Sequence, residues 1–467
     1  MSIPTNAPEV THLPDTPDAM AQVRREFASG RTRDRAWRAK QLRNMIRMLD
    51  EQEDQIAAAL ADDLGRSRTE AWLGDISSTR AEAVFALKHL RRWMRRQRQP
   101  LPLVQYPGSA WVQYEPLGVV LVIGPWNYPV YLTLSPLVAA LAAGNCAVLK
   151  PSELAPATST LLARLVPEYL DSKAVLVVEG DAAVTQELLA QGFDHVLFTG
   201  GTEVGRKIMA AAAPTLTPVT LELGGKSPVI VAADADLDVA ARRIAWVKCA
   251  NSGQTCIAPD YVLADHRIRD RLVDKIVAAI EQFERDGDAD GRRIVNNRQF
   301  TRLASYLAQT RGTIALGGQV TKASLSIKPT VIVDPHPDDA VMQEEIFGPI
   351  LPVLSYESLD EAIAFVNSRP KPLAGYYFTK SAAVGQRLVD EIPSGGAVIN
   401  HVAMHCLVPQ LPFGGVGASG MGAYHGRWGF EALSHRKSVL RKTFHPDLQL
   451  LYPPYSERAL QILRKIF

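Results

Sequence analysis

The spacing of hydrophobic residues changes along the chain, and the change predicts two kinds of structure. Between residues 18 and 99 the apolar positions follow a helical period and share one helix face, as at Leu42, Met45, Ile46 and Leu49. From Gly118 onward, short continuous apolar runs alternate with longer stretches of helical pattern. Because continuous apolar strands joined by crossover helices are typical of parallel sheets covered on both faces, the pattern predicts an α/β fold.

The apolar runs fall into two groups, which predict two sheets. The first group comprises Val119–Ile123, Ala147–Leu149, Val175–Val178, His195–Thr199 and Val219–Leu223. The second group follows Gly224 and comprises Pro228–Ala232, Tyr261–Leu263, Thr330–Val333, Ile350–Leu354, Gly375–Phe378 and Gly396–Ile399. Ligands of parallel sheets bind beside the carboxyl ends of the strands, so the chemistry is expected there.

Residues 100–118, between the helical region and the alternating region, contain four prolines. The pair Pro107-Gly108 predicts a turn between two strand-like runs, one around Val104 and Tyr106 and one around Trp111 and Tyr114. Val439–Leu440 near the C-terminus predicts a second projecting strand. Exposed strand edges seek partners, so these segments favour self-association.

Composition and charge exclude several classes of protein. Lysine and arginine total 51 against 49 aspartates and glutamates, and a net charge of +2 gives no electrostatic reason to expect nucleic acid as a partner. No apolar run approaches the roughly 18 residues of a membrane span, so no transmembrane segment is expected. The polar first 17 residues lack the features of a signal peptide. Four widely spaced cysteines without a CxxC pair indicate a reducing, cytoplasmic location and no metal site.

Two charged segments leave alternatives open. The basic cluster at the end of the helical region is interpreted as a solvated helix end, with an anionic partner as the alternative; it comprises Arg91, Arg92, Arg95, Arg96 and Arg98. The amphipathic segment Glu457–Phe467 is expected to pack on its own protein, with a membrane surface as the alternative.

Polar and glycine-rich motifs stand where the predicted strands end. In chain order they are Gly124-Pro125-Trp126-Asn127-Tyr128-Pro129, Leu149-Lys150-Pro151-Ser152-Glu153, Phe198-Thr199-Gly200-Gly201-Thr202-Glu203-Val204-Gly205 and Leu221-Glu222-Leu223-Gly224-Gly225-Lys226. Three further motifs are Asn251-Ser252-Gly253-Gln254-Thr255-Cys256, Gln343-Glu344-Glu345-Ile346-Phe347-Gly348-Pro349 and Leu411-Pro412-Phe413-Gly414-Gly415-Val416-Gly417.

This ordered set of motifs resembles the aldehyde dehydrogenase superfamily, from about residue 18 to 456. The short N-terminus, the segment Gly420–Gly426, the pair Ser434-His435 and the segment Tyr452–Tyr455 are similar to its class 3 group of fatty, aromatic and coniferyl aldehyde dehydrogenases. The resemblance implies oxidation of an aldehyde to the carboxylic acid with NAD as the cofactor and NADP as the alternative. It also implies a homodimer.

The fold expected on these grounds has a Rossmann-like cofactor domain, a second α/β catalytic domain and a small β bridging or oligomerisation unit. The expected cofactor domain combines residues 18–97 and 118–223, and the catalytic domain spans 224–431. Residues 98–117 and 432–467 form the bridging unit, and residues 1–17 form an N-terminal arm.

Three residues are the catalytic candidates. Cys256 is predicted to attack the aldehyde, because hydride can leave only from a tetrahedral centre, which a thiolate creates. Asn127 is predicted to donate its amide to the developing oxyanion, and the resemblance implies the Cys256 backbone N–H as the second donor. Glu222, between two leucines, is predicted to be a partly desolvated general base that activates water for thioester hydrolysis. Pairing of Glu222 with Lys226 is the alternative, and Glu345 could share the role of base.

The cofactor candidates lie at the same strand ends. The resemblance implies that Lys150 and Glu153 hold the adenosine ribose; a glutamate there repels a 2′-phosphate and favours NAD, with NADP open. Gly200, Gly201 and Gly205 lead into a predicted helix over 202–213, whose N-terminus can receive pyrophosphate. The resemblance adds to the cofactor site Trp126, Leu223, Glu345 and Phe347.

The substrate pocket is the least determined part of the prediction, and its candidates are Tyr128, Trp246, Thr255 and Ile257. No arginine stands beside the Cys256 loop in a position that would obviously grip a substrate carboxylate, so a neutral aliphatic or aromatic aldehyde is favoured. The alternative functions are a CoA-acylating aldehyde dehydrogenase and a non-catalytic, crystallin-like protein. Glu222 argues against the first, and the three catalytic candidates argue against the second.

Overall fold

A computed structural model of the protein describes residues 16–286 and 292–466. The predicted N-terminal arm, residues 1–17, lies outside this range except where the first helix begins. The chain then forms the predicted helical region, which consists of α1 (Thr16–Ala28), α2 (Arg35–Glu51), α3 (Glu53–Leu64), α4 (Arg68–Ala71), a π-helical turn (Trp72–Ile76) and α5 (Ser77–Trp93). Leu42, Met45 and Leu49 are fully buried on one face of α2, as the helical period predicts.

The first sheet has six strands in the order β17-β7-β6-β3-β4-β5. Its strands are β3 (Val119–Ile123), β4 (Cys146–Lys150), β5 (Val175–Val177), β6 (His195–Thr199), β7 (Val219–Glu222) and the antiparallel edge strand β17 (Gly420–Met421). Its helices are α6 (Tyr131–Ala143), α7 (Pro156–Tyr169), α8 (Ala182–Ala190) and α9 (Thr202–Ala212). The chain order reverses between β3 and β6, which are neighbours and parallel. A doubly wound sheet binds its ligand at such a switch point.

The second sheet has seven strands in the order β10-β13-β14-β9-β8-β15-β16. These are β8 (Pro228–Val231), β9 (Tyr261–Asp265), β10 (Thr313–Leu316), β13 (Thr330–Val333), β14 (Ile350–Tyr356), β15 (Ala374–Phe378) and β16 (Gly396–Ile399). Only β10 runs antiparallel to its neighbour. The helices are α10 (Leu237–Cys249), α11 (Arg269–Asp286), α12 (Asn297–Gln309), α13 (Ala340–Gln343), α14 (Leu359–Asn367) and α15 (Ala382–Glu391), and a small hairpin pairs β11 (Val320–Thr321) with β12 (Ser326–Ile327).

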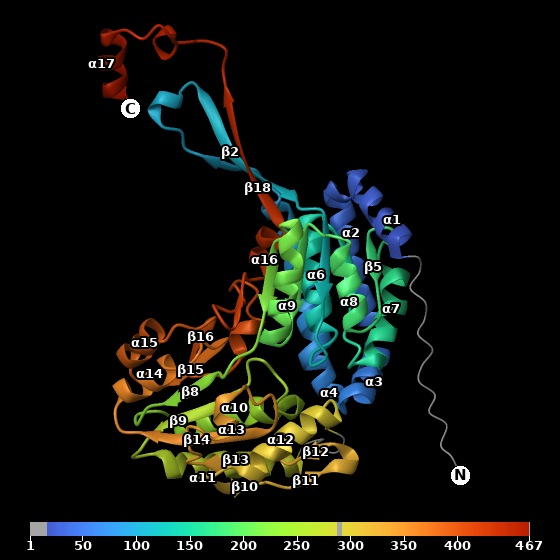
Figure 1. The fold of residues 1–467 in the computed structure, drawn as a ribbon, viewed down its shortest axis with the longest axis vertical. Coiled ribbons are helices and arrows are strands. Elements are labelled where there is room, and N and C mark those ends of the chain that lie inside the picture. The colour runs from blue at the N-terminus through green and yellow to red at the C-terminus, as the bar shows by residue number, and fades with distance from the viewer. Residues whose placement is uncertain (1–15, 287–291, 467) are drawn as a thin grey trace.

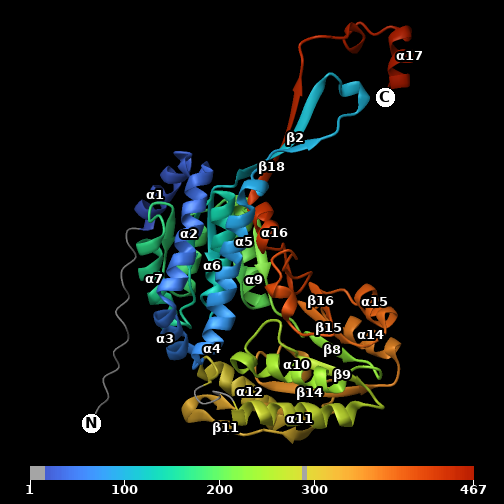
Figure 2. The same ribbon diagram turned by 180° about the vertical axis from the view of Figure 1, so that it is seen from behind.

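The two sheets form separate lobes, and a long arm extends from the first (Figures 1 and 2). The arm consists of β1 (Gln97–Gln99), β2 (Gly108–Pro116) and β18 (Ser434–Lys442). In the chain, β1 and β2 follow α5, and β18 follows α16 (Gly426–Ala432). Helix α17 (Glu457–Ile466) lies at its far end. β18 pairs with β2 over its whole length.

One detail of the predicted hairpin is wrong. The segment around Val104 forms a 3-10 turn (Leu103–Gln105), and the strand that pairs with β2 is the earlier segment Gln97–Gln99. This strand is entirely polar, so the hydrophobic pattern gave no sign of it. The wider prediction of parallel α/β sheets is confirmed by the strand pairing. Within the described ranges, no helix is long and apolar enough to cross a membrane.

Candidate active site

The turn that carries Cys256 follows α10 and has an unusual backbone. Asn251 and Ser252 adopt left-handed conformations with φ of 50° and 54°, and Gly253 follows with φ of 68°. A Cβ at Gly253 would collide with the carbonyl group of Gly348, so this position requires glycine. The turn is joined to the loop after β3 by the hydrogen bond from Asn127 Nδ2 to the carbonyl oxygen of Gln254.

Cys256 is half-buried among ionisable groups. Burial raises the pKa of its thiol, and the nearby Glu345, Cys406 and Glu222 add to this rise in that order. The structure therefore brings the predicted nucleophile within electrostatic range of both candidate carboxylates. A thiol with a raised pKa is mostly protonated at neutral pH, so its reaction requires that a neighbouring group accept the proton.

Glu222 ends strand β7 and is buried, with 2% of its surface exposed. Neither carboxylate oxygen has a hydrogen-bond partner among the described residues, and burial raises the pKa of Glu222 well above its usual value. The alternative partner, Lys226, lies elsewhere: its Nζ donates to Asp260 and to the carbonyl oxygens of Val341 (2.9 Å) and Glu344 (2.8 Å). Glu222 is thus a desolvated carboxylate without a neutralising base.

Asn127 is buried at the end of the loop that follows β3. Its Nδ2 donates to the carbonyl oxygen of Gln254 at 3.1 Å, which joins this loop to the Cys256 turn. An amide nitrogen carries two N–H groups, and no acceptor for the second is found in the part of the chain that the structure describes. That N–H group is available to a ligand.

The cofactor candidates surround the switch point of the first sheet. Lys150 is buried and donates from Nζ to Glu153 Oε2 at 2.7 Å, whereas the side chain of Glu153 is 43% exposed. The rings of Trp126 and Phe347 meet edge to face with centroids 5.3 Å apart. Burial raises the pKa of Glu345 to about 8, and Asp260 adds to this rise.

The start of α9 fits a dinucleotide. Gly201 is the N-cap of this eleven-residue helix and provides no side-chain cap, so its first N–H groups are open to a phosphate. A Cβ at Gly201 would meet nothing within 4 Å, and Thr199 Oγ1, at the end of β6, is buried without a partner among the described residues. Gly205 packs against Leu223, where a Cβ would approach the leucine side chain to 2.6 Å. Gly200 continues the turn after β6.

The structure brings two of the four substrate-pocket candidates together and places the other two apart from each other. The hydroxyl groups of Tyr128 and Thr255 lie 2.9 Å apart, so the structure joins these two residues across the Asn127 and Cys256 loops. Ile257 is 6% exposed and belongs to the core of the second lobe, and its carbonyl oxygen accepts from Tyr376. Trp246 lies on α10 and is 43% exposed.

Sequence reasoning missed several residues of this region. Cys406 was not among the predicted site residues, yet it lies within electrostatic range of Cys256. Tyr131, Tyr376 and Tyr424 are likewise buried within electrostatic range of Cys256. They come from three separate segments without a shared motif, so only the fold brings them together.

One arginine, Arg66, does lie beside the Cys256 loop, but its guanidinium is held by the protein. Arg66 is buried, and its Nε donates to Asn251 Oδ1 at 3.0 Å. Its other donors bind Asp75 and the carbonyl oxygen of Asn127. The guanidinium is thus already engaged by the protein, and it cannot also grip a substrate carboxylate. No local motif marks Arg66, because its partners lie far along the chain.

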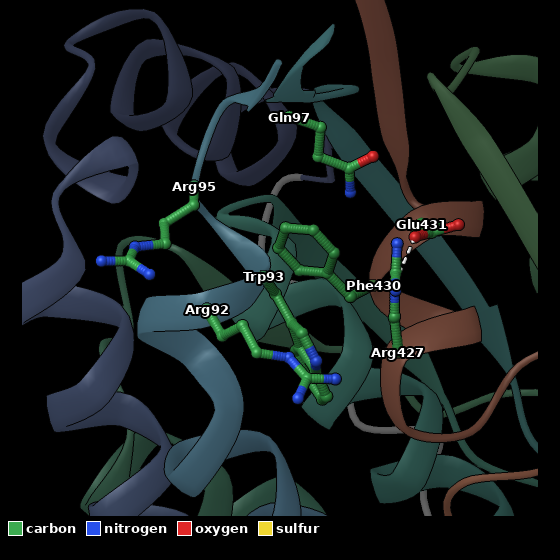
Figure 3. A pocket seen from close by; sticks show the side chains of 7 residues that line it. All are labelled: Arg92, Trp93, Arg95, Gln97, Arg427, Phe430 and Glu431. Atoms are coloured by element: carbon green, nitrogen blue, oxygen red, sulfur yellow. Dashed lines mark hydrogen bonds and ion pairs between the residues drawn. The ribbon is translucent and has the colours of Figure 1, made fainter. Parts of the chain in front are cut away.

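The arginine cluster at the end of α5 lies apart from these residues. Figure 3 shows a hollow of about 230 Å³ at the base of the arm, lined by Arg92, Trp93, Arg95, Gln97, Arg427, Phe430 and Glu431. Arg427 forms an ion pair with Glu431 at 2.6 Å. None of the predicted catalytic or cofactor residues lines this hollow.

Comparison with known proteins identifies the family. The model of the aldehyde dehydrogenase family matches residues 7–439. The chain is 47% identical to aldehyde dehydrogenase family 3 member A2 of Mus musculus over 441 residues, covering 93% of this chain and 91% of that protein. It is 46% identical to the dimeric NADP-preferring aldehyde dehydrogenase of Rattus norvegicus over 442 residues, covering 94% and 97%.

A solved structure agrees with these relatives. Staphylococcus aureus AldH in its substrate-bound state superposes with a TM-score of 0.94 at 39% identity, covering 97% of this chain and all of that one. The chain belongs to the aldehyde dehydrogenase family. The predicted fold, family and NAD(P)-dependent enzyme class are thereby confirmed.

Proposed function

We propose that this chain oxidises a neutral aliphatic or aromatic aldehyde to its carboxylic acid with Cys256 as the nucleophile. The observation that carries the proposal is the placement of Cys256 beside Glu222, a buried carboxylate whose oxygens have no partner among the described residues. Burying a carboxylate without a partner is unfavourable, so such a group is retained at a site where chemistry uses it.

The reaction begins at the thiol. The Cys256 sulfur bonds to the aldehyde carbon as its proton passes to water, and the carbonyl oxygen becomes an oxyanion. The free N–H of Asn127 and the backbone N–H of Cys256 donate to that oxyanion. Bound NAD(P) would supply the hydride acceptor. Departure of hydride from the tetrahedral carbon leaves a thioester on Cys256.

Glu222 completes the cycle. Its raised pKa makes it a stronger base than an ordinary glutamate once it is ionised, and its position near Cys256 suits removal of a proton from water. The hydroxide attacks the thioester carbon, the C–S bond breaks, and the carboxylic acid leaves with regeneration of the thiol. Glu345, whose pKa is also raised, is the second candidate for this role.

The cofactor residues follow from the geometry of the switch point. The N-terminus of α9 would hold the pyrophosphate, and Lys150 and Glu153 the adenosine ribose. Trp126, Leu223 and Phe347 would flank the nicotinamide end, and Glu345 its ribose. The exposed carboxylate of Glu153 favours NAD, whereas the rat relative is described as NADP-preferring, so both cofactors need to be tested.

The proposal that the substrate is a neutral aldehyde rests on the hydrogen bonds that Arg66 makes within the protein. Three of the five N–H groups of this guanidinium donate to Asp75, Asn251 and Asn127, and the side chain is only 2% exposed, so it is withdrawn from a substrate carboxylate. The side chains paired beside Cys256 are uncharged: the hydroxyl groups of Tyr128 and Thr255 lie 2.9 Å apart. This surrounding favours uncharged aldehydes over those with a second acidic group.

We further propose a cytoplasmic homodimer assembled through the arm. The arm exposes large apolar side chains, among them Leu103 at 88% and Phe444 at 93% exposure, which favours burial against a second copy. The rat relative is described as dimeric. All four cysteines are free, which agrees with a reducing compartment. In this proposal the cofactor domain, the catalytic domain and the bridging unit keep the boundaries expected from the sequence.

The test is a panel of aldehydes assayed with NAD and with NADP, read by absorbance of the reduced nicotinamide. We expect neutral aldehydes to be oxidised and dicarboxylic semialdehydes to be poor substrates. Analysis of the product with and without CoA separates hydrolysis from acyl transfer. Formation of acyl-CoA in preference to the free acid would refute the hydrolytic role of Glu222.

A further inference from the structure

Arg66 and Asp75 form an ion pair that is buried on both sides, with 2% and 0% of their side chains exposed. Arg66 follows the C-cap glycine of α3, and Asp75 lies in the π-helical turn before α5. Both belong to the helical region that precedes the first sheet. A buried ion pair is costly to desolvate and is often replaceable by apolar residues without loss of stability, so its presence calls for a further reason.

The contacts of Arg66 lead directly to the catalytic loops. Its Nε donates to Asn251 Oδ1 in the Cys256 turn, and Nη2 donates to the carbonyl oxygen of Asn127. The guanidinium also lies over the ring of Tyr128, with Cζ 4.2 Å from the ring centroid. One side chain therefore holds both loops, which are 61 and 185 residues away from it in sequence.

Asp75 fixes Arg66 against the first sheet. One carboxylate oxygen binds Arg66, and the other accepts from the backbone N–H groups of Val130 (3.0 Å) and Tyr131 (2.8 Å). These N–H groups belong to the start of α6, where a negative charge is favourable. The pair is thus anchored to the same loop that carries Asn127, whose amide donates to Gln254 in the thiol turn.

Asn251 closes the network. Its Nδ2 donates to the carbonyl oxygens of Asn127 (3.0 Å) and Gln254 (3.1 Å), and the Asn127 amide donates to Gln254 as well. Asn251 has a left-handed backbone, which its bond from Arg66 helps to hold. Apart from the contact between the Tyr128 and Thr255 hydroxyl groups, the hydrogen bonds between the Asn127 loop and the thiol turn in the described residues all involve Arg66, Asn251 or Gln254.

We propose that Arg66, fixed by Asp75, is a positioning residue that sets the Asn127 amide and the Cys256 turn at the spacing the first chemical step requires. It does not touch the reacting atoms. The inference rests on the proposed function, because it assigns Arg66 to the step in which Cys256 attacks and Asn127 stabilises the oxyanion. Small misplacement of reacting groups costs rate steeply, so losing this clamp should slow that step.

The test compares Arg66→Met with the matched control Arg38→Met. Arg38 is also buried in the helical region, where it donates to the carbonyl oxygens of Thr32, Ala142 and Arg33, each at 3.1 Å. Each variant removes a buried guanidinium, and each leaves three hydrogen-bond acceptors without their donor. Only Arg66 is connected to the catalytic loops, so a general loss of packing affects both variants while a positioning role affects one.

Two readouts are measured in the full-length enzyme. Each variant is assayed at the same number of degrees below its own Tm. In Arg66→Met we expect the pre-steady-state burst of NADH to slow about 10- to 100-fold, with the cofactor Kd within about 3-fold of the wild type. We expect Arg38→Met to keep the burst rate within about 3-fold. Arg66→Lys, which keeps the charge but supplies a single point donor, should recover part of the burst.

The second readout does not depend on aldehyde oxidation. The rate at which iodoacetamide alkylates Cys256 is followed by peptide mass spectrometry, with Cys406 in the same digest as the internal reference. A changed rate of Cys256 alkylation in Arg66→Met but not in Arg38→Met supports the positioning role. This support holds even if the enzyme oxidises no aldehyde. Failure to oxidise any aldehyde would reject only the proposed function. Equal effects of the two variants on burst and alkylation would overturn the inference.

If Arg66→Met does not fold, Asn251→Gly provides the second variant. Glycine accepts the left-handed backbone of this position, so the change removes the side-chain bonds without adding strain. We expect the same loss of burst in smaller measure. A wild-type burst in this variant would contradict the link between Arg66 and the thiol turn.

Discussion

The crevice around Cys256 and the arm at the other end of the first lobe both leave groups unsatisfied in the single chain, but of opposite kinds. In the crevice the unsatisfied groups are polar and buried: both oxygens of Glu222 and the Thr199 hydroxyl have no partner among the described residues. On the arm they are apolar and exposed, as at Phe444 and Tyr106.

This difference separates two kinds of partner. A buried polar atom without a partner is costly, and a ligand or reacting group satisfies it. An exposed apolar side chain is satisfied only by another apolar surface, and a second copy of the chain offers one. The comparison therefore predicts that changes in the crevice alter chemistry and leave assembly intact, whereas changes on the arm do the reverse.

The largest effect is expected from Cys256→Ala. Removal of the nucleophile should lower turnover at least about 1000-fold, because no tetrahedral centre can form. The cofactor Kd, measured by fluorescence quenching, and the sedimentation coefficient should stay unchanged. Residual turnover near the wild-type level would reject Cys256 as the nucleophile.

Glu222→Gln should separate the two halves of the reaction. We expect a burst of NADH followed by turnover reduced about 100-fold, because the thioester forms but water is not activated. Since burial raises the pKa of Glu222, wild-type kcat should increase with pH as the carboxylate ionises, and the variant should lose this dependence. Equal loss of burst and turnover would assign Glu222 another role.

The raised pKa of Glu345, a half-buried carboxylate near Cys256, should affect the free energy of unfolding. The pKa of Glu345 is raised to about 8, so the folded state binds a proton that the unfolded state releases between about pH 4.5 and 8. The free energy of unfolding of the wild type therefore falls over this window. Glu345→Gln should be more stable than the wild type by up to about 5 kcal/mol above pH 8 and nearly equal at pH 4.5, measured by urea unfolding. An advantage independent of pH would contradict this explanation.

On the arm, Phe444→Asp should weaken the homodimer about 10-fold, because a charge replaces an apolar contact at the proposed interface. Sedimentation velocity at several concentrations measures the change. The burst of NADH per subunit should stay within about 2-fold of the wild type, since the crevice is unaltered. An unchanged dimer would place the interface away from this part of the arm.

The smallest effect is expected at the rim of the crevice, where Glu153 is partly exposed. Glu153→Gln removes the repulsion of a 2′-phosphate, so the ratio of kcat/KM for NADP over NAD should rise about 3- to 10-fold. Screening by solvent limits the size of this change. If the ratio does not move, the ribose contact proposed for Glu153 is wrong.

Much of the fold was predictable because it rests on local patterns. Strands Val119–Ile123 and His195–Thr199 have the predicted bounds, since buried parallel strands are largely apolar along their length. The edge strand Gly396–Ile399 is partly exposed and also keeps its predicted bounds. Strands that are exposed or entirely polar, such as Thr313–Leu316 and Gln97–Gln99, gave no such pattern and were missed.

The amino-acid sequence by itself determined the class of fold, the family and the identity of the candidate residues, because strand ends and their motifs are short, local features. It could not determine which side chains pair across the crevice. Whether Glu222 meets Lys226, and which groups Arg66 holds, depends on how strands and helices far apart in sequence come together. Only the tertiary structure decides this, since hydrogen bonds and burial act over a few ångströms of space and not along the chain.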